Sequence, residues 1–323
     1  MSCAIPETPL TPVEARRAVA RCVALDDLRE LSAGHRLREL AVFVAMWGAG
    51  TALALWGLGL GGLWRALAMG AGVATSALAL NAFVLLLHEG MHGVLFRSRA
   101  LNRAVSVLLG ATVLMSFSAY RTLHTQHHDE LGTDDDPDDY HAYTDRAGVF
   151  WLLQYVRLTV GCFLYLLAVP LTALRRGSRA DRVGILVEYP VIAALVAMAV
   201  WAVPPEALLW GWLAPLPLVA LMVQVRGLTQ HGLTDRHDAL LASRTVRPHP
   251  VVAFLLLNEN YHLEHHLFPE VPSYHLPELH RRVWPVLPRA VEGDSYLGFL
   301  GAFARATPAL DETPVGVVAP AGE

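Results

Sequence analysis

The sequence of 323 residues contains no lysine, so all 25 of its basic residues are arginine, and it has only three cysteines. Cys3, Cys22 and Cys162 are far apart, so they cannot assemble a thiolate zinc site or an iron–sulfur cluster. Electrons for any redox reaction must therefore come from outside the chain. No clustered basic footprint of the kind that binds nucleic acid is visible, so we expect no nucleic-acid partner.

Charge is also scarce within long stretches of the chain. Hydrophobic residues make up 54% of the sequence and the mean hydropathy is +0.38, while charged residues gather in the tails and in histidine-rich loops. This composition is too apolar for an ordinary soluble domain. It predicts an all-α, polytopic membrane protein built around one membrane domain.

Four apolar runs are long enough to cross a hydrocarbon core of about 30 Å. They cover residues 40–63, 66–87, 183–203 and 207–225. The run over 104–119 is short for a span and suits a re-entrant or interfacial segment. The run over 149–170 is long enough to span but carries Gln154 and Arg157 in its first two turns. Because an even number of crossings must separate His128 from His262 for the boxes to share one side, we expect this run to lie in the interface. The predicted architecture is therefore about four transmembrane helices with interfacial or re-entrant helices and a histidine-rich cytosolic cap.

Histidines concentrate in three short motifs. These motifs are HEGMH with His88 and His92, HTQHH with His124, His127 and His128, and YHLEHH with His262, His265 and His266. In the second and third motifs the spacing is i, i+3 and i+4, which on a helix puts all three imidazoles on one face.

Imidazole is the commonest protein ligand for transition metals, and it binds in its neutral form. A structural zinc takes four protein ligands and a catalytic zinc three. The histidines of the three motifs exceed the needs of one zinc ion, so they favour two metals. Nitrogen-rich coordination with open positions suits redox iron.

The three motifs, with the following LFPEVPSYHLPELH, resemble those of the integral-membrane fatty acid desaturase superfamily, which also contains hydroxylases and carotenoid ketolases. The resemblance covers roughly residues 38–290. It implies two non-haem iron ions, O2 as co-substrate, a lipid or acyl-chain substrate, and electrons from an external ferredoxin or similar donor with its reductase. We expect a fatty acyl desaturase, with a hydroxylase or a carotenoid ketolase as the alternative.

The resemblance also assigns roles to individual residues. It makes the box histidines the metal ligands and implies a ninth, for which His231 is our candidate; a polar helix cap is the alternative for this residue. The family position that can carry a water-linking asparagine is Gly227 here. Carboxylates that could hold the second imidazole nitrogens are embedded in the boxes: Glu89, Asp129, Glu259 and Glu264. The acidic run over 134–139 fits a solvated loop, although it is similar to a stretch found in bacterial members.

The boxes can share metals only if they face the same side of the membrane. This requirement predicts four crossings, with both termini and all boxes on one face. Arginines are frequent on that face, whereas the opposite turns contain only Arg65, so the positive-inside rule puts the metal site on the cytoplasmic face of the inner membrane. One arginine cluster fits either an acidic electron donor or this rule alone: Arg175, Arg176, Arg179 and Arg182.

Two other classes of function deserve comparison. HEGMH is also an H-E-x-x-H zinc-protease motif with Glu89 as general base, but an intramembrane protease leaves the other two boxes unexplained. A metal transporter or a haem-anchoring protein would need ionisable residues at mid-membrane along a path. Glu188, the acid inside the third run, lies within reach of the surface.

The first residues predict a surface helix. Thr11, Pro12 and Glu14 have the types expected at the N-cap, the first turn and the capping box. This amphipathic helix can lie on the membrane, on the domain or in solution. We divide the chain into an N-terminal cytosolic segment (1–37), a membrane di-iron domain (38–305) and a disordered tail (306–323).

Overall fold

The computed structural model describes residues 5–306 and divides into two compact units. The unit that contains the second and third boxes, here the histidine unit, comprises Met1–Glu30, Leu123–Thr159 and Gln224–Glu323. The membrane unit comprises Leu31–Thr122 and Val160–Val223. The predicted disordered tail, 306–323, lies outside the described residues except for Ala306.

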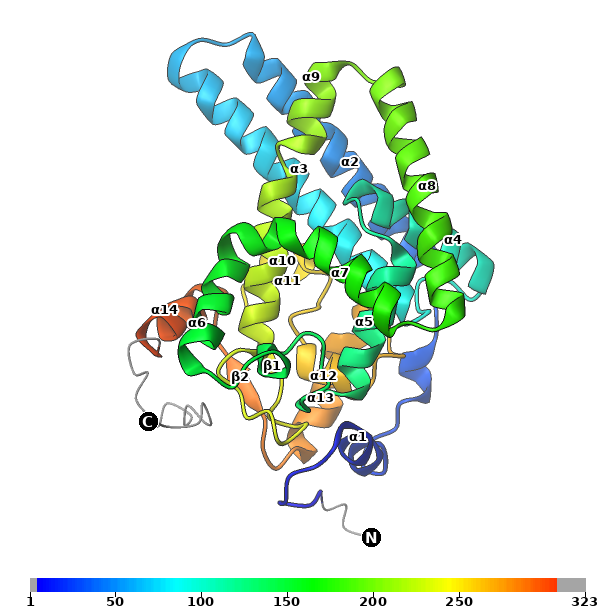
Figure 1. The fold of residues 1–323 in the computed structure, drawn as a ribbon, viewed down its shortest axis with the longest axis vertical. Helices are drawn as coiled ribbons and strands as arrows, with labels where there is room; N and C mark the ends of the chain where they lie inside the picture. The colour runs from blue at the N-terminus through cyan, green and yellow to red at the C-terminus, as the bar shows by residue number, and fades with distance from the viewer. Residues whose placement is uncertain (1–4, 307–323) are drawn as a thin grey trace. The chain divides into compact units, whose positions relative to one another are not determined.

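The described secondary-structure elements of the membrane unit are all helices (Figure 1). Its elements are α2 (Ala33–Leu58), α3 (Gly62–Met91), α4 (Arg99–Thr112), the start of α5 (Phe117–Asp129), α7 (Cys162–Arg176), α8 (Arg179–Ala202), α9 (Pro205–Leu208), the π-helical turn η4 (Leu209–Leu213) and the start of α10 (Leu216–His231).

Four helices in the described residues are long and apolar enough to cross a bilayer: α2, α3, α8 and the continuous stretch Pro205–His231. Two further helix pairs reach that length only if each is counted as one bent span. The prediction of an all-helical membrane protein with about four spans is confirmed. Helix α2 begins well before residue 40 because Ser32 caps it by accepting a hydrogen bond from the backbone N–H of His35.

Helices α2 and α3 pack side by side as a hairpin (Figure 1). A Cβ added at Gly72 would lie 2.5 Å from the backbone nitrogen of Ala54, and one at Gly50 would lie 2.8 Å from the carbonyl oxygen of Gly72. The two backbones can approach this closely because these positions have no side chain, as is common between membrane helices.

The short apolar run over 104–119 does not form a straight span. The chain turns by 101° between α4 and α5, at Leu114, whose φ is +60°. Glu188 of α8 stabilises the turn, since its carboxylate accepts hydrogen bonds from Ser116 Oγ at 2.7 Å and Ser118 N at 2.8 Å and pairs with Arg103 at 2.8 Å. Glu188 is only 3% exposed, so it does not reach the surface as expected but is neutralised inside the protein.

The histidine unit combines short helices with one small parallel sheet. Its elements are α1 (Pro12–Ala20), η1 (Asp26–Arg29), the end of α5, η2 (Tyr140–Ala142), α6 (Ala147–Val156), the start of the π-helical turn η3 (Arg157–Gly161), the end of α10, β1 (Arg244–Val246), α11 (Pro250–Leu255), α12 (His262–Leu267), η5 (Ser273–His275), α13 (Leu276–Val283), η6 (Trp284–Val286), β2 (Val291–Gly293) and α14 (Tyr296–Ala306). Strand β1 pairs with β2, with Arg244 opposite Val291. The single interfacial helix predicted over 149–170 is instead two helices, α6 and α7, interrupted at η3.

Helix α1 packs on the core of the histidine unit. Thr11 and Glu14 form the predicted capping box, and the fully buried Val19 joins a cluster that includes Leu263 and Leu279. An ion pair of 2.7 Å between Asp27 and Arg282 adds a polar contact beyond the helix. Of the three environments left open for this helix, the structure therefore has it on the domain.

Candidate metal centre

The third box lies on a short amphipathic helix, α12. His262, His265 and His266 share one face through their i, i+3 and i+4 spacing. On the other face Leu263 and Leu267 are buried in the cluster that also holds α1 and α13. Burial of this apolar face fixes the rotation of the helix and so directs the three imidazoles to one side.

Seven predicted ligands from distant parts of the sequence come together in the histidine unit. The second box supplies three from the end of α5, α12 supplies three, and α10 supplies His231 at its last residue. The side-chain amide of Gln230 donates a hydrogen bond of 2.7 Å to the carbonyl oxygen of Glu259, just before the third box. This contact sets the end of α10 against the segment that carries the third box.

The imidazoles form two groups. In the first, the Nε2 atom of His128 lies 3.1 Å from that of His124 and 3.2 Å from that of His265. In the second, His127, His231 and His266 offer ligand nitrogens that all lie within 4.8 Å of one another.

His262 extends the second group. Its Nε2 atom lies 2.8 Å from that of His231 and 3.1 Å from that of His266. The two groups are neighbours, since the rings of His128 and His266 stack with centroids 4.3 Å apart. The arrangement can therefore hold two metal ions side by side.

The chemistry of these donors fits a metal. Metal–imidazole bonds are about 2.0–2.1 Å long, so two nitrogens on one ion are expected to lie about 3 Å apart, as several pairs do here. Ligation also requires neutral rings. Burial, reinforced by the imidazoles of His128 and His262, lowers the pKa of His266 well below its ordinary value, so this ring is neutral at physiological pH.

Two of the rings have their second nitrogen fixed by an acceptor. His127 Nδ1 lies 2.8 Å and 3.0 Å from the two carboxylate oxygens of Asp136, and His231 Nδ1 lies 3.2 Å from the carbonyl oxygen of Ala242. An Nδ1–H that donates to these acceptors leaves Nε2 free to bind a metal. The sequence grouped Asp136 with a solvated acidic run, yet the residue is only 2% exposed. Asp136 also accepts a hydrogen bond from the backbone N–H of Asp138, and this turn is the feature that could have identified it.

Replacing Asp136 with alanine should weaken metal binding by about 10- to 100-fold, the usual cost of losing the acceptor behind a ligating histidine. Asp136→Asn keeps an oxygen acceptor for His127 and should lose less. Asp145→Ala, at an exposed position of the same segment, is the matched control. Competition with a chelator measures the metal affinity of each variant, and equal affinities for Asp136→Ala and the control would show that Asp136 has no such role.

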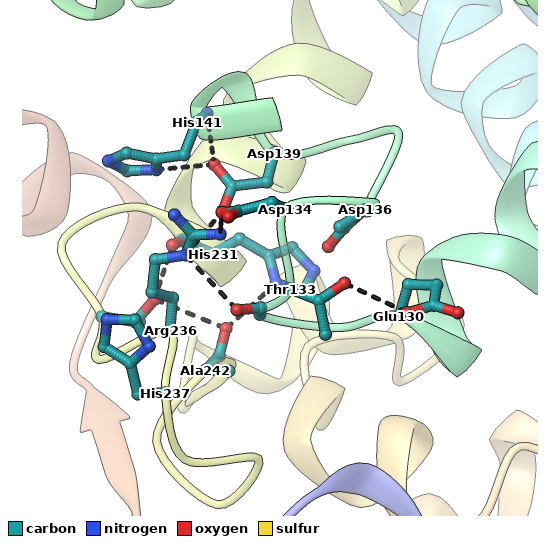
Figure 2. Close-up of polar contacts among 12 residues, drawn as sticks. Glu130, Thr133, Asp134, Asp136, Asp139, His141, His231, Arg236, His237 and Ala242 are labelled. Atoms are coloured by element: carbon teal, nitrogen blue, oxygen red, sulfur yellow. Dashed lines mark hydrogen bonds and ion pairs between the residues drawn. The ribbon is translucent and has the colours of Figure 1, made fainter. Parts of the chain in front are cut away.

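The loop after the second box is anchored to the loop after His231. Figure 2 shows Arg236 beside Asp134 and Asp139, with ion-pair distances of 2.7 Å and 3.4 Å. Gly132 has a φ of +81°, and an added Cβ would lie 1.8 Å from the carbonyl oxygen of Arg236, so only glycine permits this approach. The two loops that follow His128 and His231 are thus held together by backbone contact as well as by charge.

The predicted carboxylates differ in their surroundings. Glu264 is fully buried and accepts hydrogen bonds of 2.5 Å from Thr245 Oγ1 and from His280 Nδ1. Glu259 is also buried, whereas Asp129 is exposed. The Glu264–His280 pair links α12 to α13 and so holds the helix of the third box in place.

The first box belongs to the membrane unit. His88 and His92 lie at the end of α3 with ring centroids 5.1 Å apart. Glu89, between them, forms an ion pair with Arg36 of α2, and both side chains are fully buried. Arg36 also pairs with Glu39 at 2.8 Å. A carboxylate held by a buried guanidinium is poorly suited to act as the general base of a zinc protease.

A family model described as fatty acid desaturase matches residues 64–296, a range that includes all three boxes. The chain belongs to the fatty acid desaturase family. Among curated proteins, the probable fatty acid desaturase DES1 of Sorghum bicolor is 27% identical over 262 residues, covering 69% of this chain and 66% of that protein. The human sphingolipid delta(4)-desaturase/C4-monooxygenase DES2 is 26% identical over 211 residues, covering 64% and 62%.

A third relative of this desaturase-family chain is named for a different activity. The beta-carotene ketolase of a Paracoccus species is 27% identical over 193 residues, covering 59% of this chain and 70% of that protein. The chain spans less than two thirds of the length of the Sorghum and human relatives. The family membership makes the protein a membrane oxidoreductase of the desaturase, hydroxylase and ketolase superfamily, with a histidine cluster able to hold metal.

Proposed function

We propose that this protein is an O2-dependent, non-haem di-iron desaturase that introduces a double bond into a long alkyl chain of a lipid. The observation that carries the proposal is the pair of adjacent histidine groups, with nitrogen donors and no thiolate, which suits two redox-active irons. When bound, the iron pair would supply O2 activation and hydrogen abstraction from an unactivated C–H bond.

The residues of the chain would position these irons. We propose as ligands the nine histidines His88, His92, His124, His127, His128, His231, His262, His265 and His266. Geometry within the histidine unit supports seven of them. The support for His88 and His92 is the spacing of the first box and its match to the family model. Asp136 and the carbonyl of Ala242 would hold the ligand tautomers of His127 and His231.

The membrane unit contains an apolar cavity of about 430 Å³ that supports a hydrocarbon substrate. This volume lies within the roughly 300–1,000 Å³ of small-molecule sites. Trp47 and Trp212 line it, and their indole N–H groups donate to the carbonyl oxygens of Gly211 and Thr112 at 2.6 Å and 2.7 Å. Because both polar groups are satisfied by the backbone, the rings offer only apolar surface, and each buried methylene contributes about 0.8 kcal/mol.

Electrons would come from an external ferredoxin-type donor with its reductase, because the three cysteines are too far apart in sequence for an iron–sulfur site. We also propose that the protein lies in the cytoplasmic membrane with the metal site on the cytoplasmic face. The distribution of arginines along the sequence supports this orientation.

A carotenoid ketolase or a lipid hydroxylase is the second candidate, favoured by the equal identity of the ketolase and plant desaturase relatives. Lipid and carotenoid profiling of a host that expresses the gene, against a His265→Ala control, separates these outcomes. New unsaturated lipids support the desaturase, whereas oxygenated lipids or carotenoids support the alternative. Profiles identical to the control, with an intact peptide-cleavage activity, would overturn both.

His231 offers a separate test of the ligand set. Its replacement by alanine should lower the iron content and the turnover, because its Nε2 atom faces His262 at 2.8 Å within the second group. His237→Ala, at a nearby exposed position, is the control and should keep both. Elemental analysis of the purified variants measures the iron; full occupancy and activity in His231→Ala would show that His231 only caps its helix.

A further inference from the structure

A cavity of about 70 Å³ with both polar and apolar lining residues lies in the histidine unit beside two of the candidate ligands. Its polar lining includes His127 and His231, and also Asp138, Gln154 and Arg157. The proposed ligand set makes no use of these last three side chains. Their chemistry indicates what the cavity holds.

Gln154 of α6 is the first residue that indicates what the cavity holds. The residue is 7% exposed, and no described residue provides a hydrogen-bond partner for its buried side-chain oxygen. Buried acceptors without a donor are rare in folded proteins because they lose their hydrogen bonds to water without replacement. A donor inside the cavity would satisfy this oxygen.

Arg157 is the second residue that indicates what the cavity holds. Its Nε–H donates to Gln224 Oε1 at 2.7 Å, and an added Cβ at Gly227 would lie 2.4 Å from its NH2 nitrogen. The absence of a side chain at Gly227, one turn before His231 on α10, therefore leaves space for the guanidinium of Arg157. Arg157 supplies donors at the cavity, while Asp138 and Gln154 supply acceptors.

Size and polarity together select the occupant. A water molecule needs about 10–15 Å³ of such volume, so the cavity has room for several. Water can donate to the amide oxygen and the carboxylate and accept from the guanidinium in the same place. Water is the smallest species that offers both donors and acceptors to these groups.

We propose that this cavity holds a cluster of ordered water molecules through which protons travel to the metal centre, which the cavity adjoins at His127 and His231. The purpose of the water rests on the proposed function. In desaturation, one O2 takes up two hydrogens from the alkyl chain, two electrons from the external donor and two protons from solvent, and gives two water molecules and one C=C bond. The two solvent protons need a path to a buried site, and the lining residues provide its hydrogen-bonding groups.

The thermal midpoint of Gln154→Leu tests the presence of water without any substrate. Leucine is similar in size and removes the acceptor. If the cavity is hydrated, the variant loses hydrogen bonds to water and unfolds at a lower temperature than the parent. If the cavity is dry, removal of an unpaired acceptor raises the midpoint, which would overturn the proposal. Because the measurement can be made on purified protein without turnover, its failure is distinguishable from failure of the proposed function.

Asp138→Asn tests the passage of protons. The variant should keep its iron content, lose at least about tenfold in turnover, and show a larger solvent deuterium isotope effect than the parent. Asp145→Asn, at an exposed position, is the control. Parental turnover with an unchanged isotope effect in Asp138→Asn would contradict proton transfer through this cavity, whatever product the enzyme makes.

Discussion

Replacement of His265 with alanine is expected to abolish turnover and to empty or halve the metal centre. His265 is fully buried, and its Nε2 atom lies 3.2 Å from that of His128. Loss of an outer partner of a ligand already costs about 10- to 100-fold in metal affinity or activity, and loss of a ligand should cost more. Metal analysis and product profiling of the purified variant measure the two effects.

The control for this prediction is a histidine outside the cluster. His249→Ala changes a residue whose ring nitrogen caps α11, and it should keep metal and turnover. A His265→Ala variant with the parental metal content would show that the first histidine group is a hydrogen-bonded cluster without a bound ion.

The second large effect is expected at Arg36. Arg36→Met leaves the fully buried carboxylate of Glu89 without its guanidinium, and breaking a buried ion pair in this way costs about 3–5 kcal/mol. The midpoint of thermal unfolding in detergent should fall clearly. Arg38→Met, at an exposed position on the same helix, should leave the midpoint unchanged.

A double variant separates charge from packing at this pair. Arg36→Met combined with Glu89→Gln removes both charges, so it should recover much of the stability that Arg36→Met alone loses. If the double variant is less stable than the single one, packing of the Arg36 side chain rather than its charge would explain the effect.

The membrane spans could be predicted from the sequence because long apolar runs have few alternatives to a bilayer. The ends of these spans could not be predicted in the same way. Helix α2 starts at Ala33, capped by Ser32, and so includes Arg36, whose charge is neutralised by Glu89 from a distant part of the sequence. Likewise, the run over 149–170 gave no sign that it would break at η3.

The metal centre, too, could be predicted from the sequence only in part. The box spacing predicted which histidines share a face, and six of them, together with His231, lie close to one another within one unit. The groups that orient them depend on contacts between distant segments. Asp136 reads as one acid in a charged run, and His280 has no motif spacing, yet each lies within hydrogen-bonding distance of one buried partner, His127 and Glu264 respectively. Periodicity reports the faces of helices, whereas these partners come from loop geometry.

The most direct test of a shared two-metal centre is the metal content of the purified protein, measured together with that of His127→Ala and His128→Ala. These two residues belong to different histidine groups. We predict close to two irons per chain in the parent and a loss of iron in both variants. A single zinc ion per chain, unchanged when either histidine is replaced, would contradict the assignment.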